Sequence, residues 1–178
     1  QRFGPNNGKR EVLMTFEPIT GASIAIQVHL AAAIVAAFLG PVAIYRKRRD
    51  RIHRWVGRTW VGVMVVVAVS GLFIPAVILP LIGVFGPIHL FSVWVMISLF
   101  RGVRAIRRRD VKRHKAEMQT MYWMALGIAG LLTLLPGRRL NTVLFGAQEQ
   151  VGIWVIAAAL GLGFTVYFAR VRPRRSQT

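Results

Sequence analysis

The sequence predicts an all-α protein, a polytopic membrane helical bundle with five transmembrane helices, the first four of which form two duplicated hairpins. The 178 residues are 54% hydrophobic, yet 24 Lys and Arg stand against 6 Asp and Glu, for a net charge of +18. These charges come in blocks between uncharged runs of about 20 residues or more, the length a helix needs to cross a bilayer. A soluble nucleic-acid-binding protein would spread its charges over solvated faces, so no nucleic-acid partner is expected.

The uncharged runs place the helices along the chain. Residues 18–45 are long enough for one tilted span. Residues 59–100 form a run of 42 uncharged residues, and within it Pro80, Gly83, Gly86 and Pro87 indicate two spans joined by a tight turn. Residues 118–137 and 150–169 each supply 20 uncharged residues for the fourth and fifth spans.

The chain divides into an external polar arm, a four-helix transmembrane core, a fifth transmembrane helix and a basic cytoplasmic tail. These parts occupy residues 1–17, 18–146, 147–170 and 171–178. Cytoplasmic loops accumulate Lys and Arg, and 19 of the 24 basic residues lie in the first loop, the third loop and the C-terminal tail. This distribution predicts a multi-pass membrane protein with its N-terminus outside and its C-terminus in the cytoplasm.

The basic clusters at the predicted cytoplasmic face are expected to contact anionic lipid headgroups. Each basic residue near such a surface gains about 1 kcal/mol of attraction. The residues assigned to this contact are Arg46, Arg48, Arg107 and Arg109.

The spacing of histidines and aspartates predicts an internal repeat. His29 precedes Asp50 by 21 residues, and His89 precedes Asp110 by the same 21 residues. The first and second helices therefore resemble the third and fourth as a duplicated hairpin. Both copies run in the same direction across the membrane, which is the parallel type of repeat found in some transporters.

Four histidines fall in two layers of the predicted bundle. His29 and His89 lie at equivalent depth toward the outer face, and His53 and His114 lie at the cytoplasmic ends of the second and fourth helices. A b-type haem takes two neutral imidazoles from facing helices, so each layer supplies one pair of axial ligands. Haem iron is the only metal considered, because neither layer has a third ligand for a catalytic zinc. The alternative role is structural, with the outer rings bonded to nearby hydroxyl or backbone groups and the inner rings among headgroups.

No other arrangement of residues suggests catalysis, so the sequence favours a protein that is not an enzyme. There is no phosphate-binding glycine loop and no nucleophile elbow. The few carboxylates lie beside arginines or at helix entrances, where ion pairs and helix-end effects explain them. The absence of cysteine excludes disulfides, thiolate metal sites and thioether-linked haem.

Small residues recur every four positions on two helices, an arrangement that lets backbones approach closely. These residues are Ala32, Ala36 and Gly40 on the first helix, with Ala157 and Gly161, and Ala159 and Gly163, on the fifth. The fifth helix therefore has two small-residue faces, whereas a peripheral helix that packs on one neighbour needs only one. It is expected to pack either on its own bundle or on another membrane subunit.

The sequence resembles a bacterial family of predicted membrane proteins known only as a domain of unknown function. The resemblance rests on the joint order of short motifs over about residues 25–146: an intramembrane His29, His-Arg-Trp-Val-Gly-Arg from His53, Gly-Pro-Ile-His-Leu from Gly86, Arg-Arg-Asp followed by His114, and Leu-Leu-Pro-Gly-Arg from Leu134. It implies a multi-helix inner-membrane protein and brings no catalytic residues. The four histidines fall on positions that resemble the family's histidines, which favours a role for them.

Three functions remain open from the sequence. The first is an accessory or structural subunit of a larger membrane complex, such as a bioenergetic one, which needs no cofactor. The second is a b-type haem electron-transfer protein with two bis-histidine sites. The third is a small transporter, which is suggested by the parallel repeat. It is the weakest of the three, because transporters place charged or broken-helix features at the bilayer midplane and none is evident here.

Overall fold

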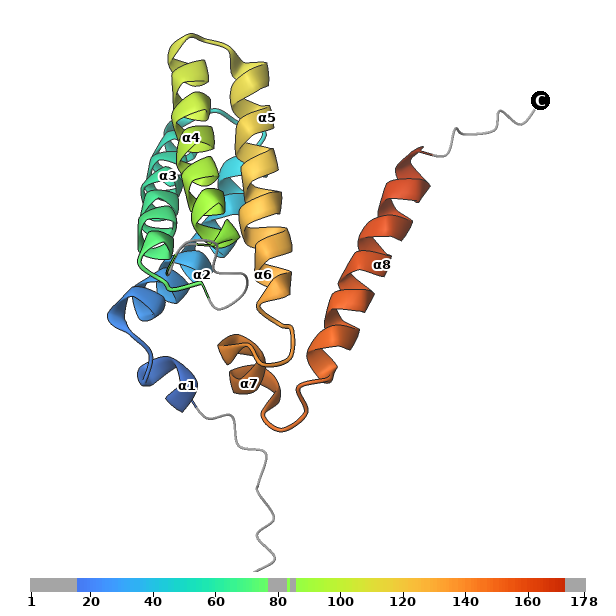
Figure 1. The fold of residues 1–178 in the computed structure, drawn as a ribbon. Helices are drawn as coiled ribbons and strands as arrows, with labels where there is room; N and C mark the ends of the chain where they lie inside the picture. The colour runs from blue at the N-terminus through green and yellow to red at the C-terminus, as the bar shows by residue number, and fades with distance from the viewer. Residues whose placement is uncertain (1–15, 77–82, 84–85, 172–178) are drawn as a thin grey trace, which may run out of the picture. The chain divides into compact units, whose positions relative to one another are not determined.

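The computed structural model describes residues 16–76, 83 and 86–171, and within these residues the chain forms helices and turns and no strand. The helices are α1 (Glu17–Thr20), α2 (Ile24–Tyr45), α3 (Arg51–Leu72), α4 (Pro87–Arg107), α5 (Val111–Met121), the π-helix η1 (Tyr122–Ile128), α6 (Ala129–Leu132), α7 (Arg139–Phe145) and α8 (Val151–Val171) (Figure 1). They belong to two compact units, which meet in the sequence near residues 19 and 131. Nearly all of the predicted external arm and cytoplasmic tail lies outside the described residues.

Residues 20–130 form a bundle of four long helices. α2 packs on α3, α3 on α4 and α4 on α5, and α5 with η1 packs back on α2. The four helices therefore stand in a ring around the bundle axis, in which α2 is diagonally opposite α4 and α3 is diagonally opposite α5. Loops of a few residues join α2 to α3 and α4 to α5, so these neighbours run antiparallel, as in other bundles with short connections (Figure 1).

The bundle core combines apolar packing with hydrogen bonds from aromatic side chains. Trp60 and Met64 on α3 are fully buried, as is Ala36 on α2. The indole N–H of Trp60 donates to the carbonyl of Ala36 at 2.9 Å. The ring of Tyr122 lies 6.4 Å from that of Trp60, centroid to centroid, and its hydroxyl donates to the carbonyl of Ala37 at 3.2 Å. These two aromatic residues fix α3 and η1 against one face of α2.

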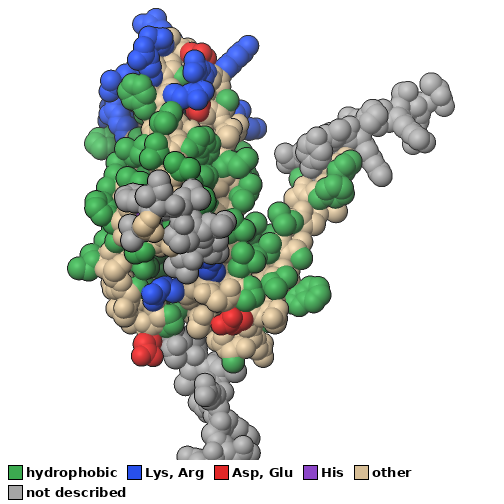
Figure 2. Space-filling model, in the orientation of Figure 1, with side chains coloured by type: hydrophobic (Ala, Val, Ile, Leu, Met, Phe, Trp, Pro, Cys, Tyr) green, Lys and Arg blue, Asp and Glu red, His purple; other side chains and the backbone are tan. Residues whose placement is uncertain are grey.

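Large apolar side chains also cover the outside of the bundle, as expected where lipid is the solvent. Phe38 and Leu90 are 77% and 67% exposed. Figure 2 shows hydrophobic side chains over the middle of the molecule and Lys and Arg gathered at the end where α4 passes into α5. Such a continuous apolar surface would be an aggregation hazard in water but suits a bilayer.

Aspartate caps begin the two helices that follow the basic loops. The Oδ1 of Asp50 accepts the N–H of His53, and the Oδ1 of Asp110 accepts the N–H of Arg113, each at 3.0 Å. An aspartate in this position satisfies an N–H that has no partner within the helix. α3 therefore begins at Arg51, well before the uncharged run that predicted a span from residue 59.

The segment predicted as the fourth span is helical but changes its type along its length. It passes from α5 through the π-helix η1 into α6. Within η1, Tyr122 donates to the carbonyl of Ala37, and the indole N–H of Trp123 donates to the hydroxyl of Tyr45 at 2.9 Å. The wider π-turn has more residues per turn than an α-turn, so it brings two successive aromatic side chains toward α2.

The second unit is held together around a buried asparagine. The amide of Asn141 on α7 donates to the carbonyls of Leu134 and Glu149 at 2.5 and 2.9 Å. A Cβ on Gly152, at the start of α8, would overlap the same Leu134 carbonyl, so only glycine permits this approach. In the same unit, the Arg139 guanidinium donates to the carbonyl of Pro18 at 2.9 Å.

Three helices among the described residues are long and apolar enough to cross a membrane: α2, α3 and α4. α8 has a shorter apolar stretch, Val151–Val166, and the fourth predicted span has the composite structure described above. The structure therefore supports a membrane-embedded all-α protein with three candidate spans. The fourth and fifth spans and the duplication of the hairpins stay predictions from the sequence.

Candidate functional site: two histidine layers in the bundle

His29 is fixed against the last turns of α3. Its Nδ1 lies 2.9 Å from the carbonyl of Val67 and 3.1 Å from the Oγ of Ser70. Because a carbonyl only accepts, Nδ1 carries the proton, and Nε2 of the neutral ring keeps its lone pair. A Cβ on Gly71 would lie 3.4 Å from Cε1 of His29 and 2.7 Å from the Oγ of Ser92 on α4. The ring thus reaches the point where α2, α3 and α4 converge.

His89 lies at the same end of the bundle and is held in the opposite tautomer. The residue is buried, and its Nδ1 accepts the backbone N–H of Gly86 at 3.1 Å, which caps the start of α4. Nδ1 is therefore unprotonated and Nε2 of the neutral ring carries the proton. Ser92, one turn further along α4, extends this polar face toward Gly71.

His114 is bound across the second hairpin in the way that His29 is bound across the first. Its Nδ1 lies 2.9 Å from the carbonyl of Gly102 on α4 and donates to it, which leaves the Nε2 lone pair available. A side chain on Gly102 would overlap the terminal methyl of Met118, so the glycine is what allows α5 to pack this closely.

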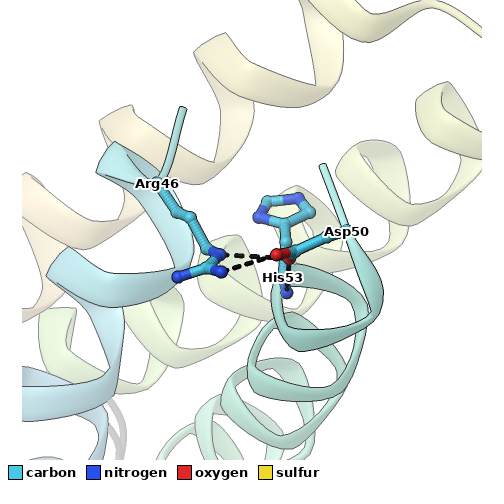
Figure 3. Close-up of polar contacts among 3 residues, drawn as sticks. All are labelled: Arg46, Asp50 and His53. Carbon is cyan, nitrogen blue, oxygen red and sulfur yellow. Dashed lines mark hydrogen bonds and ion pairs between the residues drawn. The ribbon is translucent and has the colours of Figure 1, made fainter. Parts of the chain in front are cut away.

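His53 has a buried ring nitrogen without a hydrogen-bond partner, Nδ1. Its backbone N–H is bound by Asp50, whose carboxylate also accepts two hydrogen bonds from the Arg46 guanidinium at 3.1 and 2.5 Å (Figure 3). The hydrogen bonds from Arg46, followed by that from the His53 N–H, hold the pKa of the Asp50 carboxyl well below its usual range. A buried nitrogen without a partner is costly, and such an atom marks a place where a ligand or water would be stabilised.

The two histidine layers lie at opposite ends of the bundle. His53 is 14 to 17 residues from the Val67 and Ser70 groups that bind His29 on the same helix, which corresponds to about 21–26 Å of helix. In each layer the two histidines belong to diagonally opposite helices. Within the described residues, no group of three or more metal-ligating side chains is found.

The other residues singled out from the sequence lie in several environments. On α2, Ala36 and Gly40 are buried and Ala32 is half-buried. On α8, Ala157, Gly161 and Gly163 are exposed and Ala159 is half-buried. Of the four arginines assigned to lipid, Arg46 pairs with Asp50, and Arg48, Arg107 and Arg109 are exposed.

Sequence reasoning expected a hydroxyl or backbone partner for the outer histidines and named Ser92, but it missed Ser70 and Gly71. Ser70 is a partner of His29, and Gly71 leaves space between His29 and Ser92. The adjacent Ser-Gly pair inside a run of valines was the available signal, since both residues weaken an apolar helix unless they serve packing or hydrogen bonding.

The family comparison covers the bundle and all four histidines. A family model described as "Predicted membrane protein (DUF2306)" matches residues 26–171. No curated protein matches the chain, and no solved structure matches it. The family match confirms the resemblance found in the sequence: the chain belongs to the DUF2306 family of predicted membrane proteins, a family of unknown function.

Proposed function

We propose that this membrane protein is a b-type haem electron-transfer protein with two bis-histidine sites. The observation that carries the proposal is that the two histidines of each layer belong to diagonally opposite helices. His29 is on α2 and His89 on α4, and His53 is on α3 and His114 on α5. Helical bundles build cofactor sites from inward side chains on facing helices. In a ring of four helices, two diagonally opposite helices lie at equal distances from the centre, so a group held there can take one ligand from each.

In the inner layer, one of the two rings already has the hydrogen bond that an iron ligand needs. A histidine that binds a metal donates its other ring N–H to a carbonyl or carboxylate, which fixes the ring. His114 does this with Gly102. His53 contributes a ring with an unpartnered buried nitrogen. Arg54 adjoins His53 in the sequence and carries a positive charge of the kind that pairs with a haem propionate.

The outer layer requires one rearrangement. His29 has its Nδ1 bonded to Val67, as an iron ligand would. His89 accepts the Gly86 N–H at Nδ1, so it must release Gly86 and move its proton to Nδ1 before Nε2 can bind iron. The inner site is therefore expected to bind haem more tightly than the outer one. Haems in both layers would carry electrons between the two faces of the membrane.

The test is an absorbance spectrum of the full chain, expressed with ample haem and purified in mild detergent, before and after reduction with dithionite. The expected result is a Soret band and reduced α and β bands, with up to two haems per chain. His114→Ala and His53→Ala should each remove the tighter haem. His29→Ala and His89→Ala should remove only the weaker one.

Gln27→Ala serves as the matched control, since Gln27 is a polar residue of α2 that bonds to Thr20 and Ala22 and belongs to neither layer. It should keep the full haem content. A colourless, monodisperse protein, or a haem content that none of the four histidine variants changes, would refute the proposal.

A second candidate function, an accessory subunit of a larger membrane complex, is favoured by α8. Within its own unit, α8 contacts α7 near its first turn, through Gly152 and Asn141. Among the described residues of this unit, no atom lies within 4 Å of a Cβ placed on Gly161 or Gly163. Small residues on a membrane helix favour close packing with another helix.

Blue-native electrophoresis of native membranes distinguishes this second function. Gly161→Leu should shift the chain from a large assembly to a smaller species if α8 docks on a partner. Leu162→Phe, which adds bulk at an exposed neighbouring position of α8, should leave the assembly unchanged. Migration of the unmodified chain at its own mass would contradict the accessory role.

A further inference from the structure

A groove on the side of the bundle lies between α4 and α5. It has a volume of about 340 Å³. Its walls are Trp94, Ser98 and Arg101 from α4 and Arg113, Ala116, Glu117 and Thr120 from α5. Both walls repeat at helical spacing, so the groove follows the seam between the two antiparallel helices. None of its residues belongs to the histidine layers or to the four arginines that the sequence assigned to lipid contact.

The charged end of the groove has a net charge of +1. Arg101 forms an ion pair with Glu117 at 2.9 Å, and the Glu117 side chain is only 15% exposed. The carboxylate therefore neutralises and orients one guanidinium. Arg113, whose backbone N–H caps α5 on Asp110, adds a second guanidinium to the groove wall. One unit of positive charge is thus left for an anion.

The groove changes in polarity along its length. Trp94 lies seven residues before Arg101 on α4, and Thr120 lies seven residues after Arg113 on α5, so each wall spans about 10 Å. The arginines lie toward the basic loop that joins the helices, and Trp94 lies toward the middle of α4. Ser98 and Thr120 place hydroxyl groups along the walls. From the basic loop toward the middle of α4, the groove presents charge, then hydroxyl groups, then apolar surface. This is the order of phosphate, glycerol and acyl chain in a lipid.

We propose that this groove binds one anionic phospholipid with a singly charged phosphodiester. Arg113 and the free edge of the Arg101 guanidinium bind the phosphate, with Glu117 holding Arg101 in place. The hydroxyls of Ser98 and Thr120 face the glycerol backbone, and the first part of an acyl chain lies on Trp94. A phosphodiester carries one negative charge, which balances the net charge of the groove, and a planar guanidinium recognises phosphate oxygens with two hydrogen bonds.

Native mass spectrometry of the full chain, released from detergent after exchange into defined lipids, tests this site. With phosphatidylglycerol the unmodified chain should carry one tightly held lipid, and phosphatidylcholine should not replace it at equal concentration. Arg113→Gln should reduce the lipid-bound fraction by about tenfold, which corresponds to about 1.4 kcal/mol. Lys112→Gln is the matched control, because it removes the same charge from the next position of α5 and does not line the groove.

A second variant tests the shape of the groove without a change in charge. Ala116→Phe places a ring in the groove from an exposed position, and it should also displace the lipid while the protein stays monodisperse. Equal loss in Arg113→Gln and Lys112→Gln would overturn the proposal, since it would mean general attraction to the basic surface. Displacement of the lipid by millimolar inorganic phosphate would overturn it too, because the site would then recognise phosphate alone.

Discussion

Asp50 joins two roles at the start of α3. It caps the helix through the His53 N–H and forms a bidentate ion pair with Arg46. Both interactions favour the ionised carboxylate, which is why its pKa is lowered. A group whose pKa is lower in the folded chain adds stability that is complete above its unfolded pKa, about 3.9, and is lost as the pH falls toward the folded value.

Asp50→Asn should therefore flatten the acid limb of the stability profile. The asparagine keeps the cap but loses the charge, so the difference in thermal midpoint between the two proteins should shrink as the pH falls from about 6 to 3. Thermal unfolding in detergent at several pH values measures it. Asp110→Asn is the control, because Asp110 also caps a helix and has no ion pair within the described part of the chain. Parallel profiles for wild type and Asp50→Asn would contradict the assignment.

Asn141 is the residue on which the second unit most depends. Asn141→Ala removes two hydrogen bonds and leaves the carbonyls of Leu134 and Glu149 without these donors. At about 1–3 kcal/mol for an unsatisfied buried group, amide exchange in residues 139–152 should accelerate by about 5- to 160-fold.

Hydrogen exchange followed by mass spectrometry measures this change and localises it to one unit. Thr142→Val is the control, since the Thr142 hydroxyl bonds only within its own helix, to the carbonyl of Arg138. It should alter exchange much less. Equal acceleration in α3 would show that the effect is global and not a loosening of this unit.

At the scale of elements, contact between α2 and η1 depends on one glycine. A Cβ on Gly40 would overlap the ring of Tyr122, and it would lie 3.1 Å from the indole nitrogen of Trp60. The small face predicted on α2 is thus the surface that receives two aromatic rings. α2 itself contains Pro41, so its helix is already weakened at this point.

Gly40→Ala should destabilise the bundle by about 1–3 kcal/mol, the usual cost of overpacking. Gly62→Ala on α3 is the matched control, because no atom lies within 4 Å of its added Cβ. It should be neutral or stabilising by about 0.5–1 kcal/mol, since alanine favours helix over glycine. Thermal unfolding in one detergent compares the two. Equal midpoints would mean that Tyr122 moves aside without cost.

For the whole molecule, the distribution of basic residues predicts which loops face the cytoplasm. The chain contains no cysteine, so a single introduced cysteine is the only thiol in the protein that a maleimide can label. In intact bacterial cells, Gln148→Cys in the loop before α8 should react with a membrane-impermeant maleimide. Lys112→Cys at the start of α5 should react only after lysis. The reversed pattern would place the N-terminus inside, and labelling of both in intact cells would exclude the fourth predicted span, which lies between them.

The sequence by itself determined the membrane class, the approximate positions of the helices and the family. These follow from local properties, because the length of an uncharged run sets a span. The helix caps formed by Asp50 and Asp110 came from the structure, since the sequence indicated only ion pairs for these residues. The boundary shift at α3 and the π-turn at Tyr122 were not predictable, since a charged first turn and an extra residue per turn leave no change in hydropathy.

Only the tertiary structure decided which faces meet and what each histidine ring bonds to. In a bilayer both lipid and core are apolar, so an apolar periodicity does not distinguish the inward face of a helix from the outward one. The tautomer of His29 depends on the carbonyl of Val67, which is 38 residues away and on another helix. Gly40 and Gly71 look alike in the sequence, yet one receives Tyr122 and the other receives His29 and Ser92. Such differences arise from long-range contacts, which exist only after the helices have packed.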